Sequence, residues 1–197
     1  MSRRILLLDA GHNASFHGHP LTRGKRSPEI PPGFYEGDWN REVCDLVVKM
    51  SGNDPNIVFL NPGPIGKSLW ARRLDVNRLY NLEPGCVLLS VHANASGNTL
   101  EWRKSTGTTA FIKNSPWKRS RINLESENFA NELLSIMCNS TGLRNRGVKR
   151  ANLAMTRVEC PSVLLETLFM DNLADIKTPP ESVAGAILEA WREFCNE

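Results

Sequence analysis

The stretch ILLLDAGHNASF, residues Ile5 to Phe16, combines the first predicted strand with a turn and a histidine. Its aliphatic residues run directly into Asp-Ala-Gly and then a histidine. A short aliphatic run that ends in turn-forming residues is typical of a buried strand, so we expect a strand over Arg4 to Leu8. Ala10 and Gly11 would let the backbone turn tightly, so that His12 points into a cleft instead of the core.

Outward from this strand, short apolar runs alternate with amphipathic segments. Further strands are predicted over Asn56 to Leu60, Cys86 to Val91, Thr108 to Ile112 and Ser162 to Leu165. Helices are predicted over Asp38 to Met50 with Asp38 as N-cap, Lys67 to Leu82, Arg121 to Cys138 and Ser182 to Phe194. This alternation favours one α/β domain over residues 1–197, with an open, mostly parallel twisted sheet flanked by helices on both faces.

Two stretches are predicted to be loops. Residues 12–37 lack apolar periodicity and are rich in glycine and proline. Loops of this length inside a domain usually carry function. RNRGVKR, residues Arg144 to Arg150, is predicted as a basic loop, and Arg146 within it is a candidate contact for the carboxylates of a substrate. A solvated charged surface is the alternative for this stretch.

The composition excludes several classes of protein. The chain has 197 residues, of which 41% are hydrophobic and 23% charged, and this composition is typical of a globular protein. The net charge of +3 does not demand a polyanionic partner, and we expect no nucleic acid. The five cysteines include no C-x-x-C, so neither a disulfide framework nor a cysteine zinc site is expected. No apolar run approaches the length of a membrane span, and the N-terminal run is too short for a signal peptide, so synthesis in the cytoplasm is expected.

Polar side chains stand at the carboxyl ends of the predicted strands, where open α/β sheets bind ligands. His12 follows the first strand, His92 and Asn94 follow the third, and Glu166 ends the last. Histidines and a carboxylate are the ligands of catalytic zinc sites, so this pattern indicates a metal. Candidates for the third ligand are Glu29, Glu36, Asp38, His17 and His19. Asp9 is either an outer partner of a ligand histidine or a turn carboxylate.

In these residues and their order, the sequence resembles the zinc-dependent N-acetylmuramoyl-L-alanine amidases, the peptidoglycan amidases of bacterial autolysins and phage endolysins. The pieces that carry the resemblance, in order, are ILLLDAGH, GFYEGDWN, LLSVHANAS, NRGVKRANLAM and CPSVLLETLFMDN. The resemblance implies that His12, Glu36 and His92 bind zinc and that Glu166 is the general base and acid. It also implies that Asn94 lines the cleft. The loop after DAGH departs from the family, because it reads NASFHGHP.

This chemistry would hydrolyse the amide between N-acetylmuramic acid and L-alanine. Zinc polarises a carbonyl and lowers the pKa of water to about 7. Glu166 would take a proton from that water and pass one to the leaving nitrogen. Because we see no wall-binding module and no signal peptide, we expect a phage or prophage endolysin that is released through a holin.

Two other functions stay open at this point. A cysteine peptidase of the cell wall would use one of the thiols with His92, although no cysteine stands at an obvious helix N-terminus. A non-catalytic module would bind the wall or a nucleic acid through the basic stretches. The segment NPGPIGKS is not a phosphate loop, because Asn61 stands where that motif requires glycine.

Overall fold

A six-stranded sheet in the order β4-β1-β5-β8-β6-β7 forms the centre of the molecule. This computed structural model describes residues 3–16, 19–20, 22, 25–28, 33–98, 101–117 and 119–196. The strands are β1 (Ile5–Ala10), β4 (Ile57–Phe59), β5 (Cys86–Asn94), β6 (Thr108–Lys113), β7 (Asn145–Ala151) and β8 (Ser162–Phe169). Neighbouring strands are parallel except β6 and β8, which are antiparallel. The predicted mostly parallel α/β fold is therefore confirmed.

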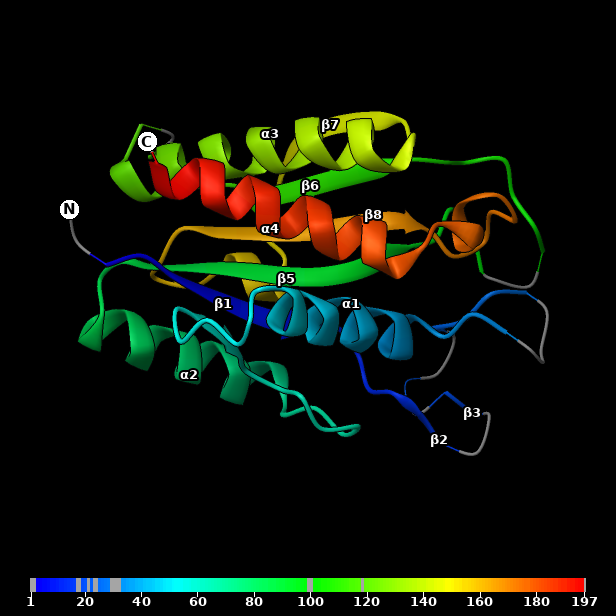
Figure 1. Cartoon of the computed structure of the whole chain (residues 1–197), viewed down its shortest axis with the longest axis horizontal. Helices are drawn as coiled ribbons and strands as arrows, with labels where there is room; N and C mark the ends of the chain where they lie inside the picture. Colours follow the sequence, from blue (N-terminus) through cyan, green and yellow to red (C-terminus); the bar gives the residue numbers. More distant parts are fainter. Residues whose placement is uncertain are drawn as a thin grey trace.

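Helices cover both faces of this sheet. They are α1 (Glu36–Met50), α2 (Leu69–Leu82), α3 (Arg121–Thr141) and α4 (Pro180–Asn196), with short 3-10 turns η1 (Ala154–Thr156) and η2 (Asp175–Lys177). Figure 1 shows α4 lying across β5 and β8, between α1 and α3. Two strands of two residues each form a separate small antiparallel sheet, and they are β2 (Ser15–Phe16) and β3 (His19–Pro20).

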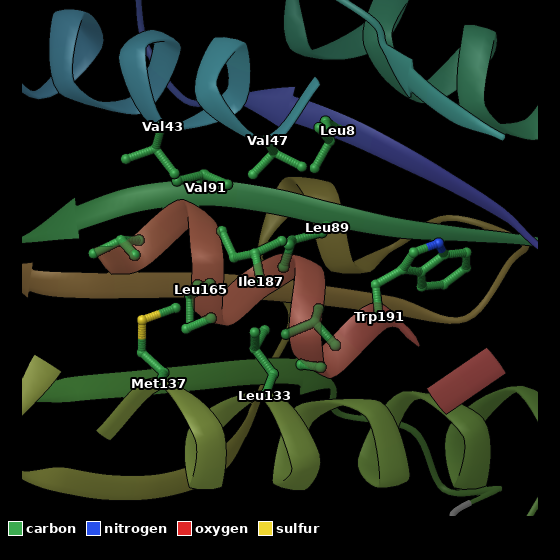
Figure 2. Close-up of a cluster of buried hydrophobic side chains, with 14 of the residues drawn as sticks. Leu8, Val43, Val47, Leu89, Val91, Leu133, Met137, Leu165, Ile187 and Trp191 are labelled. Atoms are coloured by element: carbon green, nitrogen blue, oxygen red, sulfur yellow. The ribbon is translucent and has the colours of Figure 1, made fainter. Parts of the chain in front are cut away.

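The larger core lies between the sheet and α1, α3 and α4. Figure 2 shows Val91 and Leu165 of the sheet facing Val47 of α1, Leu133 of α3 and Ile187 of α4. A smaller core on the opposite face holds residues of α2 and η1. The same face of the sheet carries the polar strand residues described below.

The structure corrects several predicted boundaries. Helix α1 begins at Glu36, with Tyr35 and not Asp38 as N-cap, and Asp38 instead accepts a hydrogen bond from the Ser15 backbone at 2.6 Å. β5 continues to Asn94 and β8 to Phe169, because β5 and β8 continue to pair past the predicted ends. The loop over residues 12–37 includes β2, β3 and a bridge between residues 26 and 35.

The prediction of a basic loop over residues 144–150 is wrong. This segment forms β7, which pairs in parallel with β6 at the edge of the sheet. Edge strands carry charged side chains because one side faces water, so the strand lacked an apolar signal. Gly147 has φ of 80° beside a register shift, which marks a bulge that only glycine adopts easily.

Candidate metal centre and the cleft around it

Three of the side chains predicted to bind metal come together at the carboxyl end of β1 and β5. His12 follows β1, Glu36 is the first residue of α1, and His92 lies in β5. One ligand atom from each residue lies within 4.8 Å of the other two. Glu36 Oε1 is 3.4 Å from His12 Nε2 and 3.1 Å from His92 Nδ1. Two imidazole nitrogens and a carboxylate are a donor set that suits zinc.

The pleat of β5 and β8 explains why His92 and Glu166 share one face. Side chains alternate across a strand. Val91 and Leu165 point into the larger core, so His92 and Glu166, the next residues, point to the opposite face. The two residues are direct partners in the β5–β8 register. This pairing places a carboxyl group beside the candidate metal ligands.

Gly11 has a different role from the one predicted. A Cβ on Gly11 would lie 2.2 Å from Cε1 of His92, so glycine is required because the imidazole packs against its backbone. The positive φ of 59° belongs to His12 itself. Asn40 Nδ2 donates to the Gly11 carbonyl at 3.0 Å and Arg41 Nη1 donates to the His12 carbonyl at 2.7 Å. Helix α1 thus holds the loop that carries His12.

The Glu36 carboxylate is buried and polar groups surround it. Oε1 accepts a hydrogen bond from the Ala93 backbone at 3.2 Å, and Lys25 Nζ is 3.7 Å from Oε2. Burial raises the pKa of Glu36, but the hydrogen bond to His92 and the nearby positive charges outweigh burial and lower it. Oε2 has no hydrogen-bond partner among the described residues. A buried carboxylate with an unsatisfied oxygen beside two imidazoles fits a metal ligand.

The pKa values of the two histidines are shifted in opposite directions. Burial lowers the pKa of His12 to about 4, so its imidazole is neutral at neutral pH and can offer a lone pair. Burial also lowers the pKa of His92, but the hydrogen bond and the charge of Glu36 outweigh it, and the net shift is upward. Metal binding to His92 therefore competes with a proton that Glu36 stabilises.

Glu166 is partly buried, and its environment favours the protonated form. Desolvation raises the pKa of Glu166 to about 7, against the lowering effect of His92. Its Oε2 atom has no hydrogen-bond partner within the described ranges. A carboxyl group with a pKa near the working pH can both accept and donate a proton.

The remaining predicted residues contact other groups than the three candidate ligands. Asp9 is fully buried, and its hydrogen bonds go to Arg72 and Ser90, so it is not the direct partner of either histidine. Asn94 ends β5 on the face of His92, and its Oδ1 accepts from the Ala95 backbone at 2.8 Å. Arg146 is the second residue of β7, and its guanidinium carbon lies 4.9 Å from the Phe169 ring centre.

Of the other candidates for the third ligand, Asp38 has a described side chain, and it is not part of the cluster. His17 and Glu29 lie outside the described residues. His19 lies in β3, and Asp38 binds the Ser15 backbone as described above. Sequence reasoning missed Lys25, which the bridge between residues 26 and 35 brings beside Glu36. A lone lysine in a glycine-rich loop offers no signal of such a contact.

The thiols are unsuited to nucleophilic catalysis. Burial raises the pKa of every cysteine, namely Cys44, Cys86, Cys138, Cys160 and Cys195. A thiol attacks only as the thiolate, which these surroundings disfavour. The cysteine-peptidase alternative therefore loses its nucleophile.

The sequence pattern of the N-acetylmuramoyl-L-alanine amidases matches residues 6–182. The chain belongs to this family. Members of this amidase family are hydrolases that act on peptidoglycan. No curated protein matches the chain. The region matched includes His12, Glu36, His92 and Glu166.

Three solved structures share the fold over almost their whole length. An N-acetylmuramoyl-L-alanine amidase from Clostridium difficile 630 superposes with a TM-score of 0.79 at 18% identity, covering 100% of this chain and 99% of that one. The catalytic domain of CwlV, an amidase from Bacillus (Paenibacillus) polymyxa var. colistinus, gives 0.74 at 25% identity, with 98% of each chain covered. The catalytic domain of the CD27L endolysin, which targets Clostridia difficile, gives 0.65 at 17% identity, covering 96% and 97%.

Proposed function

We propose that this amidase hydrolyses the bond between N-acetylmuramic acid and L-alanine with zinc held by His12, Glu36 and His92. The observation that carries the proposal is the convergence of these ligand atoms within 4.8 Å, beside a carboxyl group that is in register with His92. A zinc ion bound there would polarise the amide carbonyl and lower the pKa of water.

The side chains of the protein then have separate roles. Glu166 is the general base, because its pKa of about 7 lets it accept a proton from water near neutral pH. The same group, once protonated, donates to the leaving nitrogen of L-alanine. The buried Glu36 carboxylate offsets the charge of the cation, and its hydrogen bond from the Ala93 backbone holds it in place.

Substrate contacts are proposed at the same end of the sheet. β6 runs antiparallel to β8, so the start of β7 lies near the carboxyl end of β8. Arg146 at that position, with its guanidinium over Phe169, can contact a peptidoglycan carboxylate, and Asn94 can offer hydrogen bonds from β5.

Mass spectrometry of purified peptidoglycan after incubation with the protein tests this function. We expect free stem peptides that begin with L-alanine, loss of these products with a chelator, and recovery with added zinc. Cleavage that persists with chelator, or cleavage inside the peptide, would contradict the proposal. If zinc binds but no substrate is cut, a non-catalytic wall-binding role is the better account.

An endolysin role is a separate part of the proposal. We propose that the protein is made in the cytoplasm and reaches the wall through a holin, and the similarity to an endolysin catalytic domain supports this. In the described part of the chain no helix has the length and apolar character of a membrane span. Expression in a peptidoglycan-bearing host with and without a holin tests the role, and lysis should require both proteins.

A further inference from the structure

A recess opens beside the candidate metal ligands, on the side of α2. Its volume is about 280 Å³, and His12 and His92 form one end of it. The remaining walls come from Asn13 and Thr22 after β1, from residues 66–69 at the start of α2, and from Arg72. A group bound in this recess would lie next to the bond that the metal centre acts on.

The start of α2 gives the recess a positive end. Ser68 is the N-cap, and the first turn of this 14-residue helix holds no acidic side chain to offset the helix dipole. Asn13 Oδ1 accepts from the Gly66 backbone at 2.8 Å, which fixes the approach to the helix. Lys67 lies at the rim with 54% of its side chain exposed, in an ion pair with Asp75.

Arg72 lines the recess, and a second buried arginine, Arg41, lies near it beside Gly66. Arg41 and Arg72 are each 6% exposed. Arg72 binds Asp9 through Nη1 at 3.2 Å. The Nε and Nη1 atoms of Arg41 donate to backbone carbonyls, whereas its Nη2 has no hydrogen-bond partner among the described residues. An unpaired buried guanidinium donor is costly, so it points to a missing acceptor.

The guanidinium groups of Arg41 and Arg72 both lie close to Gly66. A Cβ on Gly66 would lie 2.6 Å from Nη2 of Arg72 and 3.4 Å from Nη2 of Arg41. The absence of a side chain at Gly66 therefore lets both guanidinium groups lie close to its backbone. Asp9 is the ion-pair partner of Arg72, whereas Arg41 has no carboxylate within 4.0 Å among the described residues, and Asp38 and Asp45 are more distant charges.

We propose that this recess is an anion subsite for the α-carboxylate of the second stem-peptide residue, a glutamate. The inference rests on the proposed amidase function, which puts L-alanine at the metal centre and the next residue within reach of the recess. Planar guanidinium groups match a carboxylate, and charge-assisted hydrogen bonds to it are strong. The subsite would select stem peptides with a free α-carboxylate over those with an amidated one.

Binding measurements on a non-hydrolysing background test the subsite. The probes are N-acetylmuramoyl-L-alanyl-D-glutamate and N-acetylmuramoyl-L-alanyl-D-isoglutamine, which differ only at the α-carboxylate. With zinc-loaded Glu166→Gln protein, we expect calorimetry to give about tenfold tighter binding of the acid. Adding Gly66→Ala should reduce that ratio to about one, because the new methyl group would come within 2.6 Å of Arg72 Nη2 and displace that guanidinium group.

Matched variants separate the subsite from general damage. Gly63→Ala is the control for Gly66→Ala, because its Cβ meets nothing closer than 3.9 Å. Lys67→Met should lower the ratio about threefold without affecting the core, and Arg78→Met on the same helix should leave it unchanged. Circular dichroism confirms that each variant folds.

The outcomes distinguish this inference from the amidase function. Equal binding of acid and amide by the Glu166→Gln protein, or a ratio that survives Gly66→Ala, overturns the subsite even if the wild-type protein cleaves both probes. A ratio that Gly66→Ala abolishes and Gly63→Ala keeps supports the subsite, even if mass spectrometry finds neither probe cleaved. In that case only the proposed amidase function fails.

Discussion

Single residues decide what this cleft can do, and Glu166 is the one with the most direct role. Glu166→Gln removes the proton acceptor but keeps the size of the side chain. We expect kcat to fall about a thousandfold, because general acid–base catalysis contributes on that order. Zinc content by elemental mass spectrometry should stay at the wild-type level, since Glu166 is not a proposed ligand. Loss of zinc together with activity would reassign Glu166 to the metal.

The raised pKa of Glu166 also predicts how stability depends on pH. Its pKa in the folded protein is about 7, above the ordinary 4.5, so the folded state holds this proton more tightly than the unfolded state. Stability is therefore lost as pH rises from 4.5 to about 7. Glu166→Gln should stabilise the metal-free protein by roughly 1–3 kcal/mol at pH 8 and by little at pH 4. Urea unfolding at both pH values measures this difference.

Gly11 supports the metal site without any functional group. Gly11→Ala would place a methyl group against the His92 ring and push it away from Glu36. We expect zinc affinity to fall about tenfold or more, as it does when the support of a ligand is removed. Competition with a chromogenic chelator measures the affinity. Unchanged affinity would mean that the His92 ring can shift without leaving the site.

At the scale of whole elements, the apolar strands were predictable and the polar ones were not. β1, β5 and β8 carry continuous apolar runs, because helices cover both of their faces. The sequence of β7 predicted a basic loop because this strand lies at an edge of the sheet and contains Gly147. The same limit applies to the site. Strand ends predicted His12, His92 and Glu166, but the Lys25 contact depends on how the loop folds back on α1.

Replacing glycine by alanine should stabilise the protein at one helical position and destabilise it at the end of another helix. Gly185 lies within α4, and a Cβ there would make only an ordinary 3.7 Å contact with Met50. Gly185→Ala should stabilise the protein by about 0.5–1 kcal/mol. Gly142 ends α3 with φ of 72°, so Gly142→Ala should destabilise it by about 1 kcal/mol. Thermal unfolding of both variants measures the two changes in stability. Changes of the same sign would contradict the helix boundaries.

For the whole molecule, a bound metal would join segments that are far apart in the sequence. His12 follows β1, Glu36 begins α1, and His92 lies in β5. In the unfolded chain these ligands are separated, so zinc binds the folded state and stabilises it. At a zinc concentration a thousandfold above Kd, the gain is about 4 kcal/mol, which raises Tm by roughly 10 °C.

Removal of one ligand identifies the site that produces this stabilisation. Glu36→Gln keeps the shape of the side chain but loses the charge that faces both histidines. We expect the zinc-dependent rise in Tm to disappear in this variant, whereas Glu166→Gln should keep it. Differential scanning calorimetry with and without a chelator makes the comparison. A rise in Tm that survives Glu36→Gln would place the stabilising metal elsewhere, and would leave the buried Glu36 to act through its ion pair with Lys25.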